Sequence, residues 1–156
     1  MVYIKQSIVI PPTKRLIRFK YHDVTTLTFP YTVFWVGPYF KHLDYSTVHI
    51  GFSNDPDFYF SQLYIPPLPH IDYDGTVCIS DTQIYSSTPK TNEELKKFIT
   101  LFFNSPFKKE YHLQANHIAN TSLRTFQKWE KLTKEKPLSY FTSNVNWGIK
   151  VRDLGI

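Results

Sequence analysis

The sequence predicts an α+β fold in which an antiparallel β-meander precedes a cysteine-bearing loop and C-terminal helices. Three observations favour it. Segments rich in β-branched and aromatic residues fill the first 65 residues, a proline-rich loop follows, and helical periodicity begins only after residue 90. The 156 residues can bury a core of their own, and 42% of them are hydrophobic, which excludes a disordered chain. We therefore predict a single domain over residues 1–156.

The strands of the meander are expected one after another. Pro11 and Pro12 stop the first of them, and Pro30 indicates an edge or a bulge inside the third. The polar residues 54–57 have the composition of a turn before the last strand. Five segments are predicted as strands: residues 2–10, 15–21, 26–36, 47–52 and 58–65.

A helix of about 14 residues is expected to begin at Thr91 and to end before Pro106. Thr91 and Glu94 have the spacing of a capping box, in which the Thr hydroxyl accepts from the Glu94 amide and the Glu94 side chain reaches back to the Thr91 amide. The apolar positions that follow fall on one face of a helix, which should pack on the sheet. These positions are Leu95, Phe98, Ile99, Phe102 and Phe103.

The last part of the chain is less regular. A second helix is predicted from Ser122 to Lys134, with Leu123, Phe126 and Trp129 on one side. Residues 145–151 alternate between apolar and polar positions like a short strand.

The most distinctive segment runs from Pro66 to Ser80 and holds Cys78, the only cysteine of the chain. Prolines fix their own φ and keep the preceding residue out of a helix, so this loop should be stiff. Asp74-Gly75 is a signal for a tight turn, because glycine accepts a positive φ without steric cost. The chain is therefore expected to turn sharply and to present one accessible thiol, eight positions after His70.

This segment resembles the active-site segment of ubiquitin-conjugating enzymes, where a His-Pro-Asn tripeptide and an acidic-Gly turn precede the thioester-forming cysteine. It is more similar to the prokaryotic branch of that superfamily typified by PRTRC system protein B. Two flanking aromatic stretches match that branch in order, Phe34-Trp35-Val36-Gly37-Pro38 and Phe102-Phe103-Asn104-Ser105-Pro106-Phe107. The resemblance spans residues 30–110. It implies a bacterial or phage protein with the ubiquitin-conjugating fold, without the N-terminal helix of the eukaryotic members.

The resemblance also implies an activity. The protein would receive a ubiquitin-like modifier from an adenylating (ThiF-like) activating enzyme and pass it from a thioester on Cys78 to a target amine. His70 stands where the family has Asn, a residue that braces the loop and donates to the oxyanion, a contribution of about 3 kcal/mol. A neutral imidazole can donate in the same way. Four further residues are candidates to orient a lysine nucleophile: Asp72, Asp74, Asp81 and Tyr85.

The residues near the cysteine suit a carrier better than a protease. Neighbouring carboxylates raise the pKa of a thiol, whereas a protease needs a thiolate with a lowered pKa. Transthiolation exchanges one thioester for another and does not require a strongly activated cysteine. The six histidines are too scattered for a zinc site, and the five glycines form no phosphate-binding loop. No metal and no cofactor are therefore expected.

The net charge of +5 is unevenly distributed. Residues 1–89 carry 6 Lys+Arg against 7 Asp+Glu, whereas residues 90–156 carry 12 against 6. This pattern is typical of a solvated basic helical surface, and also of a docking face for an acidic partner or nucleic acid. Two alternatives to the carrier stay open. His70 in place of Asn favours a non-catalytic scaffold of the same fold, and the basic second half of the chain favours, more distantly, a nucleic-acid-associated protein.

The expected location is the cytoplasm. No stretch approaches 18 consecutive apolar residues, so no membrane contact is predicted, and the N-terminus lacks the pattern of a signal peptide. A single cysteine cannot form an internal disulfide, which fits a reducing compartment.

Overall fold

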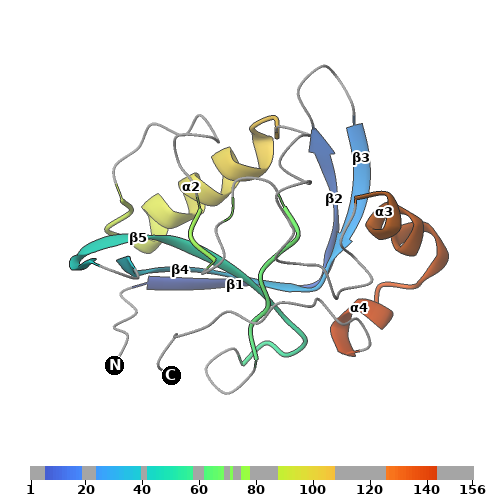
Figure 1. The fold of residues 1–156 in the computed structure, drawn as a ribbon, viewed down its shortest axis with the longest axis horizontal. Coiled ribbons are helices and arrows are strands. Elements are labelled where there is room, and N and C mark those ends of the chain that lie inside the picture. The colour runs from blue at the N-terminus through green and yellow to red at the C-terminus, as the bar shows by residue number, and fades with distance from the viewer. Residues whose placement is uncertain are drawn as a thin grey trace.

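The protein has an α+β fold with antiparallel sheets, as the sequence predicts. A computed structural model describes residues 6–18, 24–39, 42–57, 62–68, 71, 75–77, 88–107 and 126–143. Its strands are β1 (Gln6–Ile10), β2 (Thr13–Arg18), β3 (Val24–Phe29), β4 (Tyr31–Tyr39) and β5 (His42–Ser53). The helices in the described part are α2 (Asn92–Asn104), α3 (Phe126–Glu135) and α4 (Tyr140–Ser143). Figure 1 shows α2 lying across the sheet, with α3 and α4 beside the β2–β3 hairpin.

The first four strands form one long hairpin that bends at its prolines. β1 pairs with β4 and β2 pairs with β3, in two separate ladders. The register is continuous between the ladders, because Ile10 pairs with Thr32 and, three residues further along both strands, Thr13 pairs with Phe29. The break falls at Pro11, Pro12 and Pro30, which have no N–H to donate. β5 pairs with the other side of β4, so the chain traces an antiparallel meander. The β2–β3 end of the hairpin is the tip of this meander and bends away from the sheet of β1, β4 and β5 (Figure 1).

Two strand predictions need correction. Residues 26–36 do not form one strand, because Pro30 separates β3 from β4. Residues 62–65 do not form a regular strand either; within them only Tyr64 makes a bridge, to Phe52. Residues 58–61 of that predicted strand lie outside the described residues. β5 is longer than its apolar core of residues 47–52, since pairing with β4 extends it to His42.

Helix α2 confirms the predicted apolar stripe. The Glu94 amide donates to Thr91 Oγ1 (3.2 Å), so Thr91 is the N-cap. The Glu94 carboxylate accepts from the backbone N–H of Lys90 (2.5 Å) rather than from Thr91, so the expected capping box is shifted by one residue. All five predicted stripe residues are buried: Leu95, Phe98, Ile99, Phe102 and Phe103.

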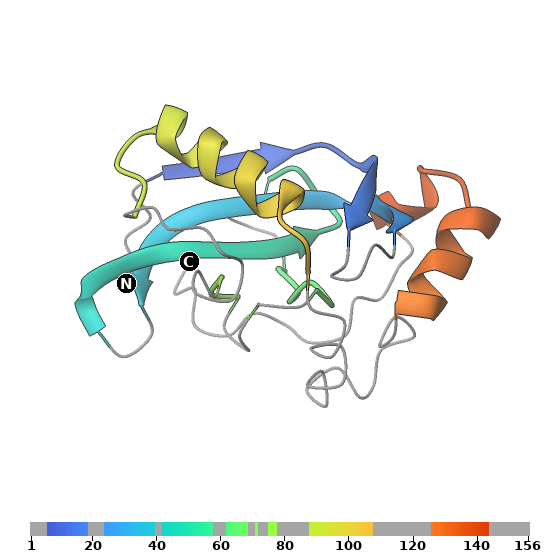
Figure 2. The same ribbon diagram turned by 90° about the horizontal axis from the view of Figure 1, so that it is seen from above.

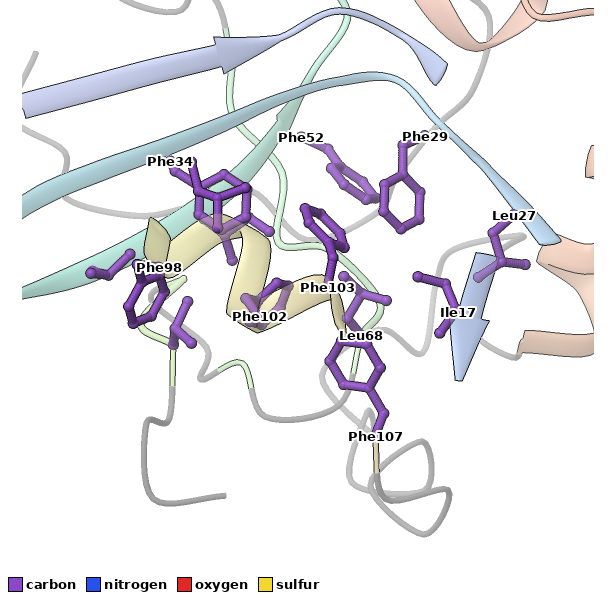
Figure 3. Close-up of a cluster of buried hydrophobic side chains, with 14 of the residues drawn as sticks. Ile17, Leu27, Phe29, Phe34, Phe52, Leu68, Phe98, Phe102, Phe103 and Phe107 are labelled. Atoms are coloured by element: carbon purple, nitrogen blue, oxygen red, sulfur yellow. The ribbon is translucent and has the colours of Figure 1, made fainter. Parts of the chain in front are cut away.

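The main core lies between α2 and the sheet. Phe34 of β4 contacts the rings of Phe102 and Phe103 edge-on, at centroid distances of 5.7 and 5.8 Å. Figure 3 shows these rings together with residues of the hairpin tip, which the bend brings over the C-terminal end of α2. There the guanidinium of Arg15 lies 4.1 Å from the centroid of Phe103, and burial lowers the pKa of Arg15.

Helix α3 closes the edge of β3 that β2 leaves open. Trp129 Nε1 donates to the Thr28 carbonyl (2.8 Å), and the Thr28 amide donates to Thr133 Oγ1 (3.0 Å). Trp129 and Thr133 are four residues apart and therefore lie on one helix face. Trp129 is buried, as its place on the predicted helix requires. The predicted start of this helix at Ser122 lies outside the described residues, as does the predicted strand at 145–151.

Candidate functional site

The chain that leads to Cys78 is attached to the free edge of β5. Phe52 and Tyr64 exchange two backbone hydrogen bonds, both of 2.8 Å. Further along, the Ile50 amide donates to the Gly75 carbonyl (2.8 Å). Figure 2 shows this segment beside β5, at the edge of the sheet opposite to β1. The edge that a meander would leave open is therefore covered at two points.

The segment reaches both faces of the sheet. On the far face, Leu63 and Ile65 pack with Val33 and Trp35 in a small second core. On the α2 side, Leu68 and Val77 belong to the main core. The described residues on both sides of the loop before the cysteine, up to Val77, are therefore part of the packed structure.

Gly75 confirms the sharp turn expected from the sequence. Its φ is +83°, in the left-handed region that favours glycine. A Cβ at this position would lie 2.8 Å from the backbone oxygen of Ile50, which no side-chain movement could relieve. Ile71 and Val77 bridge each other on either side of the turn. The turn is thus defined both by its own conformation and by its close approach to β5.

The segment around the cysteine is tethered to β5 at both ends. Before it, the Val77 amide donates to the Val48 carbonyl (2.9 Å). After it, the Thr88 hydroxyl donates to the Ser46 carbonyl (2.9 Å). Ser46 and Val48 are two residues apart on one strand, about 7 Å along it. The two described residues that flank positions 78–87, Val77 and Thr88, therefore contact β5 at nearly the same place.

The second tether continues into α2. Pro89 is buried, and the side chain of Gln6 on β1 donates to the Lys90 carbonyl. The Lys90 amide in turn donates to Glu94 in the first turn of α2. Strands β1 and β5 and the start of α2 therefore fix the point at which the chain leaves the site.

A row of three side chains crosses the far face beside the first tether. Trp35 of β4 pairs with His49 of β5, and their rings stack at a centroid distance of 5.2 Å and an angle of 8°. On the other side, His49 bridges Thr76, with 3.3 Å between His49 Nδ1 and Thr76 Oγ1. All three are at least 95% buried.

All six predicted site residues lie outside the described residues: His70, Asp72, Asp74, Cys78, Asp81 and Tyr85. Their roles therefore stay predictions. The structure brings together their neighbours in the chain, since Gly75, Thr76 and Val77 lie on the edge of β5 and Thr88 lies at the second tether.

Sequence reasoning missed the contribution of His49 and Thr76. A signal was available, because the alternation that places Val48 and Ile50 toward the main core places His49 on the opposite face. Nothing in the sequence, however, identifies Thr76 as its partner.

Charge in the described helices is partly balanced within each helix. Lys96 lies 3.3 Å from Glu93 on α2. On α3, Lys134 lies 3.1 Å from Glu130 and Lys131 lies 3.8 Å from Glu135. These pairs are exposed and contribute little to stability. The basic docking face expected for the second half of the chain stays a prediction.

Other functional signals are few in the described part of the chain. Within it, no three His, Cys, Asp or Glu residues are grouped so that they could hold a metal ion. The helices of the same part are all too short or too polar to cross a bilayer. Comparison with protein-family models, curated proteins and solved structures finds no match to this chain.

Proposed function

We propose that the protein is a ubiquitin-conjugating-like carrier of the cytoplasm, in which Cys78 forms a thioester with a ubiquitin-like modifier. The observation that carries the proposal is the double tether, at Val77 and Thr88, of the segment that contains the cysteine. A carrier must offer one thiol to two large partners in turn, first the activating enzyme and then the target. A segment attached at both ends to β5 would keep that thiol in one place for both encounters.

The order of elements also supports the proposal. An antiparallel meander comes first, the chain that leads to the cysteine follows on its edge at Gly75–Val77, and a helix packed on the sheet comes next. This is the order that the resemblance to the ubiquitin-conjugating fold implies. The two aromatic stretches that contribute to the resemblance meet in the core, where Phe34 contacts Phe102 and Phe103.

The proposed reaction has two steps. In the first, the Cys78 thiolate attacks the thioester carbonyl on the activating enzyme, a new carbon–sulfur bond forms, and the enzyme's own thiolate leaves. In the second, a target amine attacks the Cys78 thioester, an amide forms, the Cys78 thiolate leaves, and the amine loses a proton to solvent or to a nearby carboxylate. His70 would donate to the oxyanion of the tetrahedral intermediate. Asp72, Asp74, Asp81 and Tyr85 would orient the amine.

The test is a charging assay with the adenylating enzymes and ubiquitin-like proteins of the source genome, and genes that neighbour the gene of this chain are tried first. Wild type should give a covalent adduct that a thiol reductant cleaves. Cys78→Ser should give an adduct that resists the reductant, because the ester oxygen replaces sulfur, and Cys78→Ala should give none. The activating enzyme must itself charge in the same mixture, as the positive control.

One result would overturn the proposal. If the activating enzyme charges, but wild type binds it or the modifier without any adduct, the protein is a scaffold of this fold and not a carrier.

A further inference from the structure

The proposed reaction uses none of the buried polar side chains of the described part, yet His49 and Thr76 form a pair beside the first tether. The two residues are bracketed by backbone hydrogen bonds: Ile50 donates to Gly75 on one side and Val77 donates to Val48 on the other. His49 and Thr76 are therefore opposite each other at a non-hydrogen-bonded position of an antiparallel pair, where side chains approach most closely.

The pair is a direct polar side-chain contact between β5 and the Gly75–Val77 segment. His49 is 5% exposed and its ring stacks on Trp35, so the imidazole is held in one orientation. Whichever ring nitrogen carries the proton, the Thr76 hydroxyl can complement Nδ1, because a hydroxyl both donates and accepts. A buried polar contact of this kind is costly to break, since water cannot replace the lost partner.

We propose that His49 and Thr76 are positioning residues: their contact latches the Gly75–Val77 segment to β5 and so sets where the chain reaches Cys78. The part of this inference that concerns the thiol rests on the proposed function. Val77 is the single residue between Thr76 and Cys78 in the chain, and its amide is bonded to β5. His49 acts through Thr76 and is held in turn by Trp35.

The latch can be measured without any partner, by amide hydrogen exchange of the full chain. The reporters are the amides of Ile50 and Val77, which bond across the latch, and the internal control is the amide of Phe52, which bonds to Tyr64 on the same edge. Thr76→Val keeps the shape of the side chain and removes the hydroxyl. It should speed exchange of the two reporter amides by about fivefold, as the loss of one net hydrogen bond predicts, and leave the control amide unchanged.

Conservative variants separate positioning from general stability. Thr76→Ser keeps the hydroxyl and should restore protection of the reporter amides. His49→Asn places an amide group at the position of Nδ1 and should also restore it, whereas His49→Gln, with its amide one bond further out, should not. Thr32→Val is a matched control, because Thr32 is equally buried but its hydroxyl bonds only the nearby Pro30 carbonyl (3.2 Å).

The effect of the latch variants on Cys78 is measured as the rate at which iodoacetamide alkylates Cys78 in the folded protein. Thr76→Val should change this rate, and Thr76→Ser should return it to the wild-type value. Unchanged exchange at Ile50 and Val77 in Thr76→Val would overturn the latch. Faster exchange with an unchanged alkylation rate would overturn the positioning role. If both change as expected but no modifier ever charges Cys78, the latch stands and the proposed carrier function fails.

Discussion

Replacing Gly75 by alanine should weaken the attachment of the Gly75–Val77 segment to β5. The new Cβ would lie 2.8 Å from the Ile50 oxygen, and φ at this position is +83°. A residue with a Cβ costs about 1–2 kcal/mol in the left-handed region. The obstacle is a backbone atom, so relief requires the segment to move away from β5. That movement breaks the Ile50–Gly75 hydrogen bond, which contributes about 1 kcal/mol.

The expected loss is therefore about 2–3 kcal/mol in the free energy of unfolding. It can be measured by urea denaturation followed by tryptophan fluorescence, with the slope against urea checked for constancy. Gly51→Ala is the matched control. Its Cβ would lie 3.3 Å from the Trp35 ring and 3.4 Å from the Leu63 side chain, which can shift, and the expected cost is about 1 kcal/mol. Equal costs for the two variants would refute the argument that Gly75 defines the turn.

The remaining predictions test the core, the β3 edge and the proposed chemistry. Phe98→Ala should lower the free energy of unfolding by about 3–5 kcal/mol, because Phe98 is only 2% exposed; a loss under about 1 kcal/mol in urea would contradict the packing of α2. Trp129→Phe keeps a ring but leaves the Thr28 carbonyl without its donor, so it should cost about 1–3 kcal/mol, and a neutral result would mean that α3 does not close that edge. His70→Ala should slow discharge of the Cys78 thioester by about 10²–10³, with charging less affected, while His70→Asn retains discharge. Identical discharge rates in all His70 variants would remove the oxyanion role.

Patterns that depend on neighbouring residues allowed much of the fold to be predicted. The period of two in the first strands and the stripe on α2 both reflect which side of an element is buried, and the core confirms them. The turn at Gly75 was predictable for a similar reason, because a positive φ is a property of one residue. The bend at Pro30 was only partly predictable: proline indicates an interruption, but not that the register continues across it.

Contacts between distant parts of the chain could not be predicted. Thr76 lies 27 residues from His49, and Thr88 lies 42 residues from Ser46. The Trp129 bond to Thr28 joins residues 101 apart. Each of these pairings depends on how distant segments are arranged around the sheet. The local sequence around these Thr and Trp residues does not identify their partners. The candidate site was therefore recognisable from its cysteine and its turn, but the tethers that hold it were not.

The measurement that tests the central claim most directly is alkylation of Cys78 in the folded chain, followed by intact mass. A carrier needs an accessible thiol whatever its partners are. The claim predicts that one equivalent of iodoacetamide adds under native conditions, at a rate comparable to that of the urea-unfolded chain, while far-ultraviolet circular dichroism stays native. Alkylation that occurs only after unfolding would contradict the proposed carrier.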